Sequence, residues 1–60
     1  RSPDEDLREM RLQRAAALLR ERAGNVAEVA DAVGFASVSA FSRRFRERFE
    51  ESPAAFARKG

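Results

Sequence analysis

The sequence contains neither cysteine nor histidine. Without cysteine, no disulfide and no thiolate metal site can hold the chain together. Without histidine, the commonest general base and the commonest neutral metal ligand are both missing. The chain has 60 residues, and a chain of this length rarely builds a substrate pocket from carboxylates alone. We therefore expect no catalytic residue, no cofactor and no bound metal.

Long apolar runs are missing as well. No segment approaches the ~18 apolar residues of a membrane-spanning helix. The chain also opens on charged residues, unlike a signal peptide. We therefore expect no membrane partner and a cytoplasmic location. A chain of 60 residues should be one small domain or a piece of a larger protein. It buries only about 60% of its unfolded surface, so we expect marginal stability when it is alone.

The charge of the chain is small but unevenly distributed. The formal net charge is +2, which is too low to indicate nucleic acid by itself. Residues 1–35 carry six Arg against seven Asp and Glu, whereas residues 36–60 carry six Arg and Lys against three Glu. Arginine suits bidentate contacts to phosphate and guanine, although a GC-rich genome also favours it. The second part of the chain is the candidate for binding an anion.

An all-α fold is predicted, because helical periodicity recurs along the chain and no strand pattern is found. The first helix is expected over residues 3–23, with Ser2 as its N-cap, Pro3 in its first turn and Gly24 as its stop. Its apolar positions predict one buried face, made by Leu12, Ala15, Ala16, Leu18 and Leu19.

Two further helices form a predicted helix-turn-helix. The shorter is expected over residues 26–33, capped by Asn25, and the longer over residues 38–50, capped by Ser37. Between them, Gly34 can adopt a positive φ in a tight turn. A short helix, a glycine turn and a second helix make up this motif.

A last helical turn is expected over residues 53–57, with Phe56 directed towards the core. The ends of the chain, Arg1 and residues 58–60, are expected to be frayed. The result is a single helical domain over residues 3–57, in a homeodomain-like three-helix arrangement.

The expected helix at residues 38–50 has two unlike faces. Its aromatic stripe recurs at every fourth position and is formed by Phe41, Phe45 and Phe49. This spacing predicts burial rather than stacking on single-stranded bases, which is the alternative. The opposite side is polar and cationic and carries Ser39, Arg43 and Arg46. Such a helix can be anchored in a core and still present arginines to nucleic acid.

The segment from Val26 to Phe56, VAEVADAVGFASVSAFSRRFRERFEESPAAF, resembles the signature of AraC/XylS-type transcription regulators. The preceding RLQRAAALL, residues 11–19, is similar to the linker helix that comes before it in that family. The resemblance implies that this chain is the linker helix and the second of two helix-turn-helix units, within a larger bacterial regulator. The first unit, and a sensor domain with any small-molecule effector, would then lie N-terminal to it.

The family resemblance also implies which residues contact DNA. The first turns of the helix at residues 38–50 would read base edges, and the candidates there are Val38, Ser39, Ser42 and Arg43. Phosphate candidates lie at the start and flanks of this helix: Ser37, Arg44 and Arg46. The function implied is sequence-specific binding of double-stranded DNA through the major groove, without catalysis, in the bacterial nucleoid. The alternative is a protein-interaction module that contacts RNA polymerase or its own sensor domain.

Three positions depart from the family pattern. Glu50 stands where the family usually has glycine, so the third helix is expected to continue or fray there. Ala40 replaces an aromatic residue or histidine, which removes contacts at that site. Ala57 stands where arginine often follows the last aromatic residue, and Arg58 comes one position later.

Overall fold

The predicted all-α fold is confirmed. The computed structural model describes residues 3–59, and this range contains helices and no strand. The helices are α1 (Pro3–Arg20), α2 (Val26–Ala32), α3 (Val38–Phe49) and α4 (Pro53–Lys59). The proposed cap Ser2 lies outside the described residues, as do Arg1 and Gly60, which were expected to be frayed.

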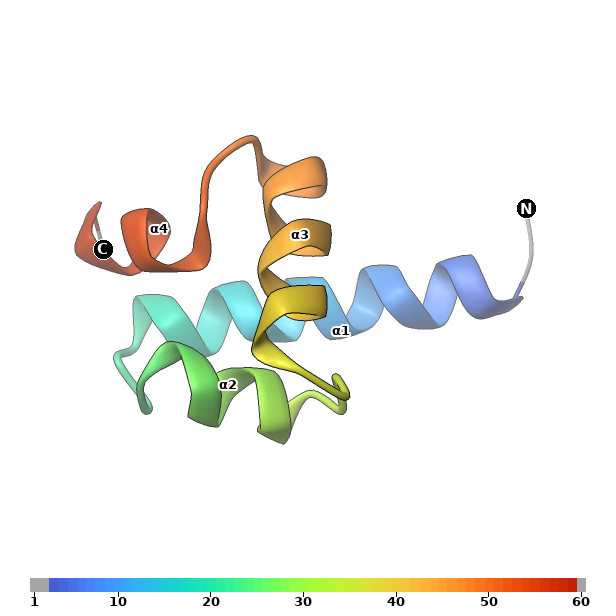
Figure 1. Cartoon of the computed structure of the whole chain (residues 1–60), viewed down its shortest axis with the longest axis horizontal. Helices are drawn as coiled ribbons and strands as arrows, with labels where there is room; N and C mark the ends of the chain where they lie inside the picture. Colours follow the sequence, from blue (N-terminus) through green and yellow to red (C-terminus); the bar gives the residue numbers. More distant parts are fainter. Residues whose placement is uncertain (1–2, 60) are drawn as a thin grey trace.

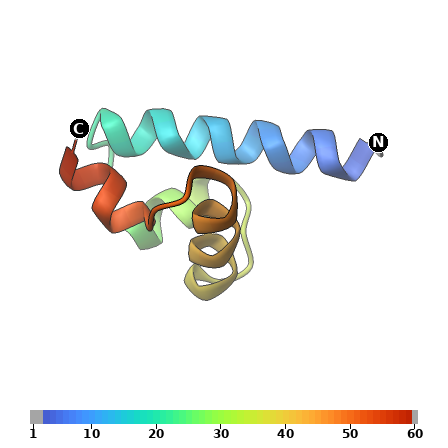
Figure 2. The same cartoon turned by 90° about the horizontal axis from the view of Figure 1, so that it is seen from above.

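The helix α1 is the longest and serves as the support for the others. The other three helices lie together on one side of it (Figure 2). In Figure 1, α3 crosses α1, and the N-terminal half of α1 extends beyond the other helices. One face of α3 is therefore directed away from α1.

The core is built from α1, α2 and α3 together. Its buried apolar residues are Leu12, Ala15, Ala16, Leu19, Val29, Ala30, Val33, Phe41 and Phe45. Phe41 and Phe45 are 0% exposed, so the expected burial of the aromatic stripe is confirmed at these two positions. Leu18, Phe35 and Phe49 are only partly buried and pack against the core. Leu18 and Phe49 are therefore less enclosed than the sequence pattern predicted.

The five phenylalanines form a continuous row of ring contacts. The row begins with Phe35 and Phe41, whose centroids are 5.3 Å apart, and Phe41 lies 5.6 Å from Phe45. Phe45 then contacts Phe49 at 4.6 Å and Phe56 at 5.3 Å. These tilted and edge-on arrangements are the favoured geometries of aromatic pairs. The predicted inward orientation of Phe56 is confirmed, and this residue joins α4 to α3.

The end of α1 differs from the prediction. The helix stops at Arg20, before Ala23, and Arg22 adopts a left-handed conformation with φ 56°. The backbone amide of Ala23 donates to the Leu18 carbonyl, and that of Arg22 donates to the Leu19 carbonyl. This pair of bonds is a Schellman motif, which satisfies carbonyls at a helix end. The earlier stop leaves enough chain to reverse direction before α2.

The boundaries of α2 follow from local hydrogen bonds. The side-chain oxygen of Asn25 accepts a hydrogen bond from the backbone amide of Glu28 at 2.8 Å. In return, the Glu28 carboxylate accepts one from the backbone amide of Asn25 at 2.9 Å. The predicted cap Asn25 is therefore confirmed, and Glu28 completes a capping box with it. At the other end, Gly34 has φ 90°, and the Phe35 amide donates to the Ala30 carbonyl at 2.9 Å. The glycine turn thus leads the chain from α2 into α3.

The C-terminal boundaries also correct the sequence prediction. The helix α3 ends at Phe49, because Glu50 takes the left-handed conformation with φ 64° that glycine usually supplies. The helix therefore neither continues nor frays at this point. Arg58 and Lys59, which were expected to be frayed, belong to α4.

Candidate nucleic-acid interface

The start of α3 is fixed by Ser37. Its side-chain oxygen accepts a hydrogen bond from the Ala40 amide at 3.1 Å, which confirms the predicted N-cap. A serine hydroxyl that accepts one bond still has a proton to donate. Ser37 is exposed, so the same side chain can cap the helix and donate a hydrogen bond to a phosphate oxygen.

The side of α3 away from the core carries most of the predicted DNA contacts. We call the row of neighbouring side chains Ser39, Ser42, Arg43 and Arg46 the outer stripe, because residues three and four apart are adjacent on a helix. Ser42, at the edge towards the core, is partly buried, whereas the other three are exposed. Val38, at the start of α3, is 41% exposed, so an apolar surface lies beside this stripe.

Both arginines of the outer stripe are available to a ligand. Within residues 3–59, neither Arg43 nor Arg46 takes part in an ion pair or a side-chain hydrogen bond. Their guanidinium groups therefore keep all their donors for another molecule. Arginine presents these donors as a rigid fork that fits phosphate or guanine in two-point contacts.

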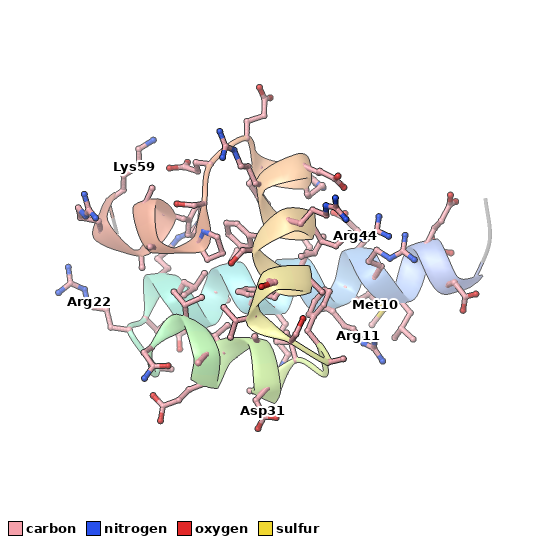
Figure 3. All side chains as sticks on the ribbon, viewed as in Figure 1. Met10, Arg11, Arg22, Asp31, Arg44 and Lys59 are labelled. Carbon is pink, nitrogen blue, oxygen red and sulfur yellow. The ribbon has the colours of Figure 1, made fainter. Side chains whose placement is uncertain are left out.

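Arg44 lies on a different flank from the outer stripe. Its side chain is directed towards the N-terminal half of α1 (Figure 3) and lies 3.7 Å from the Glu47 carboxylate. It borders a hollow of mixed charge, which is lined by Glu5, Arg8, Glu9, Leu12, Arg44, Glu47 and Arg48. The structure therefore separates Arg44 from the other predicted contacts.

A contact between α1 and α3 was not predicted from the sequence. The Arg48 Nε donates to both carboxylate oxygens of Glu9, at 2.8 and 3.0 Å. The Arg48 guanidinium also lies 4.9 Å from the centroid of the Phe49 ring. The hydrogen bond from Arg48 to Glu9, together with the negative charge of Glu9, raises the pKa of Arg48. No sequence signal links two residues that are 39 positions apart.

A carboxylate lies near the start of α3. Asp31, an exposed residue of α2 (Figure 3), lines a shallow hollow together with Ser37 and Val38. Its negative charge would oppose a phosphate at this position, whereas the hydroxyl proton that Ser37 can still donate would favour one.

The described part of the chain offers little for other kinds of site. Among residues 3–59, no group of three or more His, Cys, Asp or Glu side chains is placed to hold a metal ion. In the same range, no helix combines the length and the apolar character needed to cross a bilayer.

Comparison with known proteins identifies the family. A family model described as a helix-turn-helix domain matches residues 1–59. The chain belongs to the AraC-type helix-turn-helix family. This AraC-type chain is accordingly a DNA-binding helix-turn-helix domain of the kind found in transcription regulators.

Two relatives contain a segment similar to this AraC-type chain. One is the HTH-type transcriptional regulator AlkR of Acinetobacter baylyi, which is 40% identical over 47 residues, or 78% of this chain and 15% of the regulator. Another is histidine kinase P4 of Formosa agariphila, which is 38% identical over 55 residues, or 92% of this chain and 4% of the kinase. No solved structure matches the chain significantly. The chain thus spans only a small part of either relative.

Proposed function

We propose that this domain binds double-stranded DNA sequence-specifically by inserting α3 into the major groove. The observation that carries the proposal is the division of α3 into two sides. Phe41 and Phe45 are 0% exposed, which fixes one side in the core. The other side presents unpaired Arg43 and Arg46 on a rigid helix. A helix of this kind fits the major groove, where base edges can be read.

The base contacts follow from the chemistry of the exposed side chains. Arg43 forks onto the O6 and N7 atoms of guanine, the commonest specific contact of arginine with DNA. Ser39 and Ser42 hydrogen-bond to base edges, and Val38 contacts the methyl group of a thymine. These four residues all lie in the first half of α3.

The phosphate contacts flank the bases. Arg46 continues the outer stripe towards the end of α3 and pairs with a phosphate. Arg44 reaches a phosphate on the α1 side, in competition with Glu47 at 3.7 Å. Ser37 donates a hydrogen bond to a third phosphate, whose charge is also favoured by the positive end of α3.

We infer that the domain acts as half of the DNA-binding part of a bacterial transcription regulator in the cytoplasm. Any small-molecule effector would bind outside this chain, and RNA polymerase is a candidate protein partner. Because one helix-turn-helix reads only a few base pairs, a second unit or a dimer is needed to reach the ~10⁻⁸ to 10⁻¹¹ M affinity of specific complexes.

A salt titration tests the proposal against a protein-interaction function. The full-length protein first selects a duplex from a randomised DNA library, and its Kd for this duplex is compared with that for a scrambled duplex. Each phosphate paired with an arginine contributes a slope of about −0.9 to the plot of log K against log salt. We expect a negative slope and preference for the selected duplex. A flat plot without preference would instead favour a protein partner.

A further inference from the structure

A contact outside the proposed DNA-facing side of α3 joins this helix to α1 through Arg48 and Glu9. We propose that Glu9 of α1 is a positioning residue, which holds Arg48 and thereby sets the orientation of α3 for reading bases. This inference rests on the proposed binding of DNA by α3. It assigns Glu9 and Arg48 no direct contact with DNA.

The geometry around Glu9 is specific rather than incidental. The carboxylate accepts hydrogen bonds from Arg48 Nε through both of its oxygens. It also accepts one from Gln13 Nε2, one turn further along α1, at 2.7 Å. Gln13 thus restrains the carboxylate from its own helix. Arg48 is in turn restrained by the Phe49 ring beneath its guanidinium.

The position of Arg48 on α3 makes this contact effective. Phe41 and Phe45 fix the depth of the helix in the core, but Phe49 near its end is only partly buried. Any tilt would pivot about Phe45, which is 0% exposed. Ser39 lies six positions before Phe45, or about 9 Å along the helix axis, so a tilt of about 10° would displace Ser39 by about 1.5 Å. Base contacts tolerate far less, because hydrogen bonds weaken steeply beyond their usual lengths.

The ion pair of Arg48 and Glu9 should contribute little to the free energy of unfolding. The side chains of Arg48 and Glu9 are 45% and 34% exposed, and exposed ion pairs contribute little to stability because solvent screens them. A variant that loses the pair should consequently remain folded. Its DNA binding then reports on the orientation of α3 rather than on unfolding.

The test compares Glu9→Gln with a charge-matched control. Both Glu9→Gln and Glu21→Gln remove one negative charge, but Glu21 lies in the turn after α1 and makes no contact with Arg48. Kd is measured for the full-length protein on the selected and the scrambled duplex. A functional group displaced by more than about 0.5 Å loses its geometry, so we expect Glu9→Gln to bind the selected duplex about threefold to tenfold more weakly. Its binding to the scrambled duplex should be unchanged or stronger, because a repulsive charge has been removed.

The control variant should change binding to the selected and the scrambled duplex equally. Glu21→Gln should leave the ratio of the two Kd values as in the wild type. Arg48→Lys keeps the charge but loses the rigid fork, so it should reproduce the effect of Glu9→Gln. Combining both substitutions should cause no further loss.

Each contrary result has a distinct meaning. If Glu9→Gln binds both duplexes as Glu21→Gln does, Glu9 acts only through its charge and the inference is overturned. If Glu9→Gln unfolds in a thermal melt followed by circular dichroism, the pair is structural, which also overturns it. If the wild-type protein shows no preference for its selected duplex, the proposed function itself fails, and the inference fails with it.

Discussion

Glu50 ends α3 with the same left-handed backbone that Gly34 supplies after α2, with φ 64° and 90° respectively. Glycine adopts this conformation without steric cost, whereas a residue with a Cβ atom is strained there. Both turns therefore use a positive φ, but at unequal energetic cost. This difference leads to two opposite predictions for stability.

We predict that Glu50→Gly stabilises the domain. Removing the Cβ at φ 64° relieves a strain of about 1–2 kcal/mol, and the greater flexibility of glycine in the unfolded chain offsets part of this. The net gain should be about 0.5–1 kcal/mol, or a rise in Tm of a few degrees. Glu50→Ala, which keeps the Cβ, is the control for loss of the carboxylate. Equal melting temperatures for the two variants would contradict the prediction.

Gly34→Val should have the opposite effect. Valine would place a β-branched side chain at φ 90°, where it is strongly disfavoured. We expect a loss of about 1–3 kcal/mol, measured by thermal or urea unfolding. In Gly34→Ala, the added Cβ would lie 3.6 Å from the Arg11 guanidinium, which is an ordinary contact. This variant therefore measures the backbone strain without a clash. An unchanged melting temperature for Gly34→Val would argue against a strained turn.

Arg43 and Arg44 should differ in what they contribute to DNA binding. If Arg43 forks onto a base as proposed, Arg43→Ala should cost ~1–3 kcal/mol on the selected duplex and relax the preference at one base pair. If Arg44 pairs with a phosphate as proposed, Arg44→Ala should weaken binding to all duplexes and reduce the salt slope by about one. Both variants lose the same charge from the same helix. If both kept the wild-type ratio of specific to scrambled binding, the arginines would form only an electrostatic patch.

Asp31→Asn should strengthen binding to DNA of any sequence. Asp31 borders the hollow at the start of α3 with Ser37 and Val38, and its charge repels a nearby phosphate. We expect an increase in affinity of about twofold to fivefold at low salt, which should fade near 1 M salt as the Debye length falls to about 3 Å. Fluorescence anisotropy with a labelled scrambled duplex would measure it. An increase that persists at high salt would indicate a direct contact instead.

The sequence was sufficient to predict where helices begin but less so where they end. Asn25 and Ser37 cap their helices through hydrogen bonds to amides three residues later, and such bonds depend only on neighbouring residues. Helix ends at Arg20 and Phe49 depend instead on Arg22 and Glu50 in left-handed conformations. These residue types do not favour that conformation, so the surrounding packing decides it.

The candidate site was predictable only in part, because some of its contacts depend on tertiary packing rather than on neighbouring residues. Helical periodicity separates the outer stripe from Phe41 and Phe45, because both sets lie on one continuous helix. The flank occupied by Arg44, and the contact of Arg48 with Glu9, depend on how α1 crosses α3. A crossing angle is a property of tertiary packing, and no local pattern specifies it.

The row of phenylalanine rings limits how this domain can be controlled. Rings from the turn before α3, from α3 itself and from α4 contact one another without a break, between 4.6 and 5.9 Å apart. Close-packed interiors resist deformation, so a large slide or rotation of α3 against its neighbours is disfavoured, and only a small tilt at the Phe49 end remains open to it. A signal arriving from elsewhere in a larger protein would therefore have to move the domain as one rigid body, by changing its distance or angle to a partner domain. Regulation would then change the distance or angle between DNA-binding domains, while the internal structure of each domain stays the same.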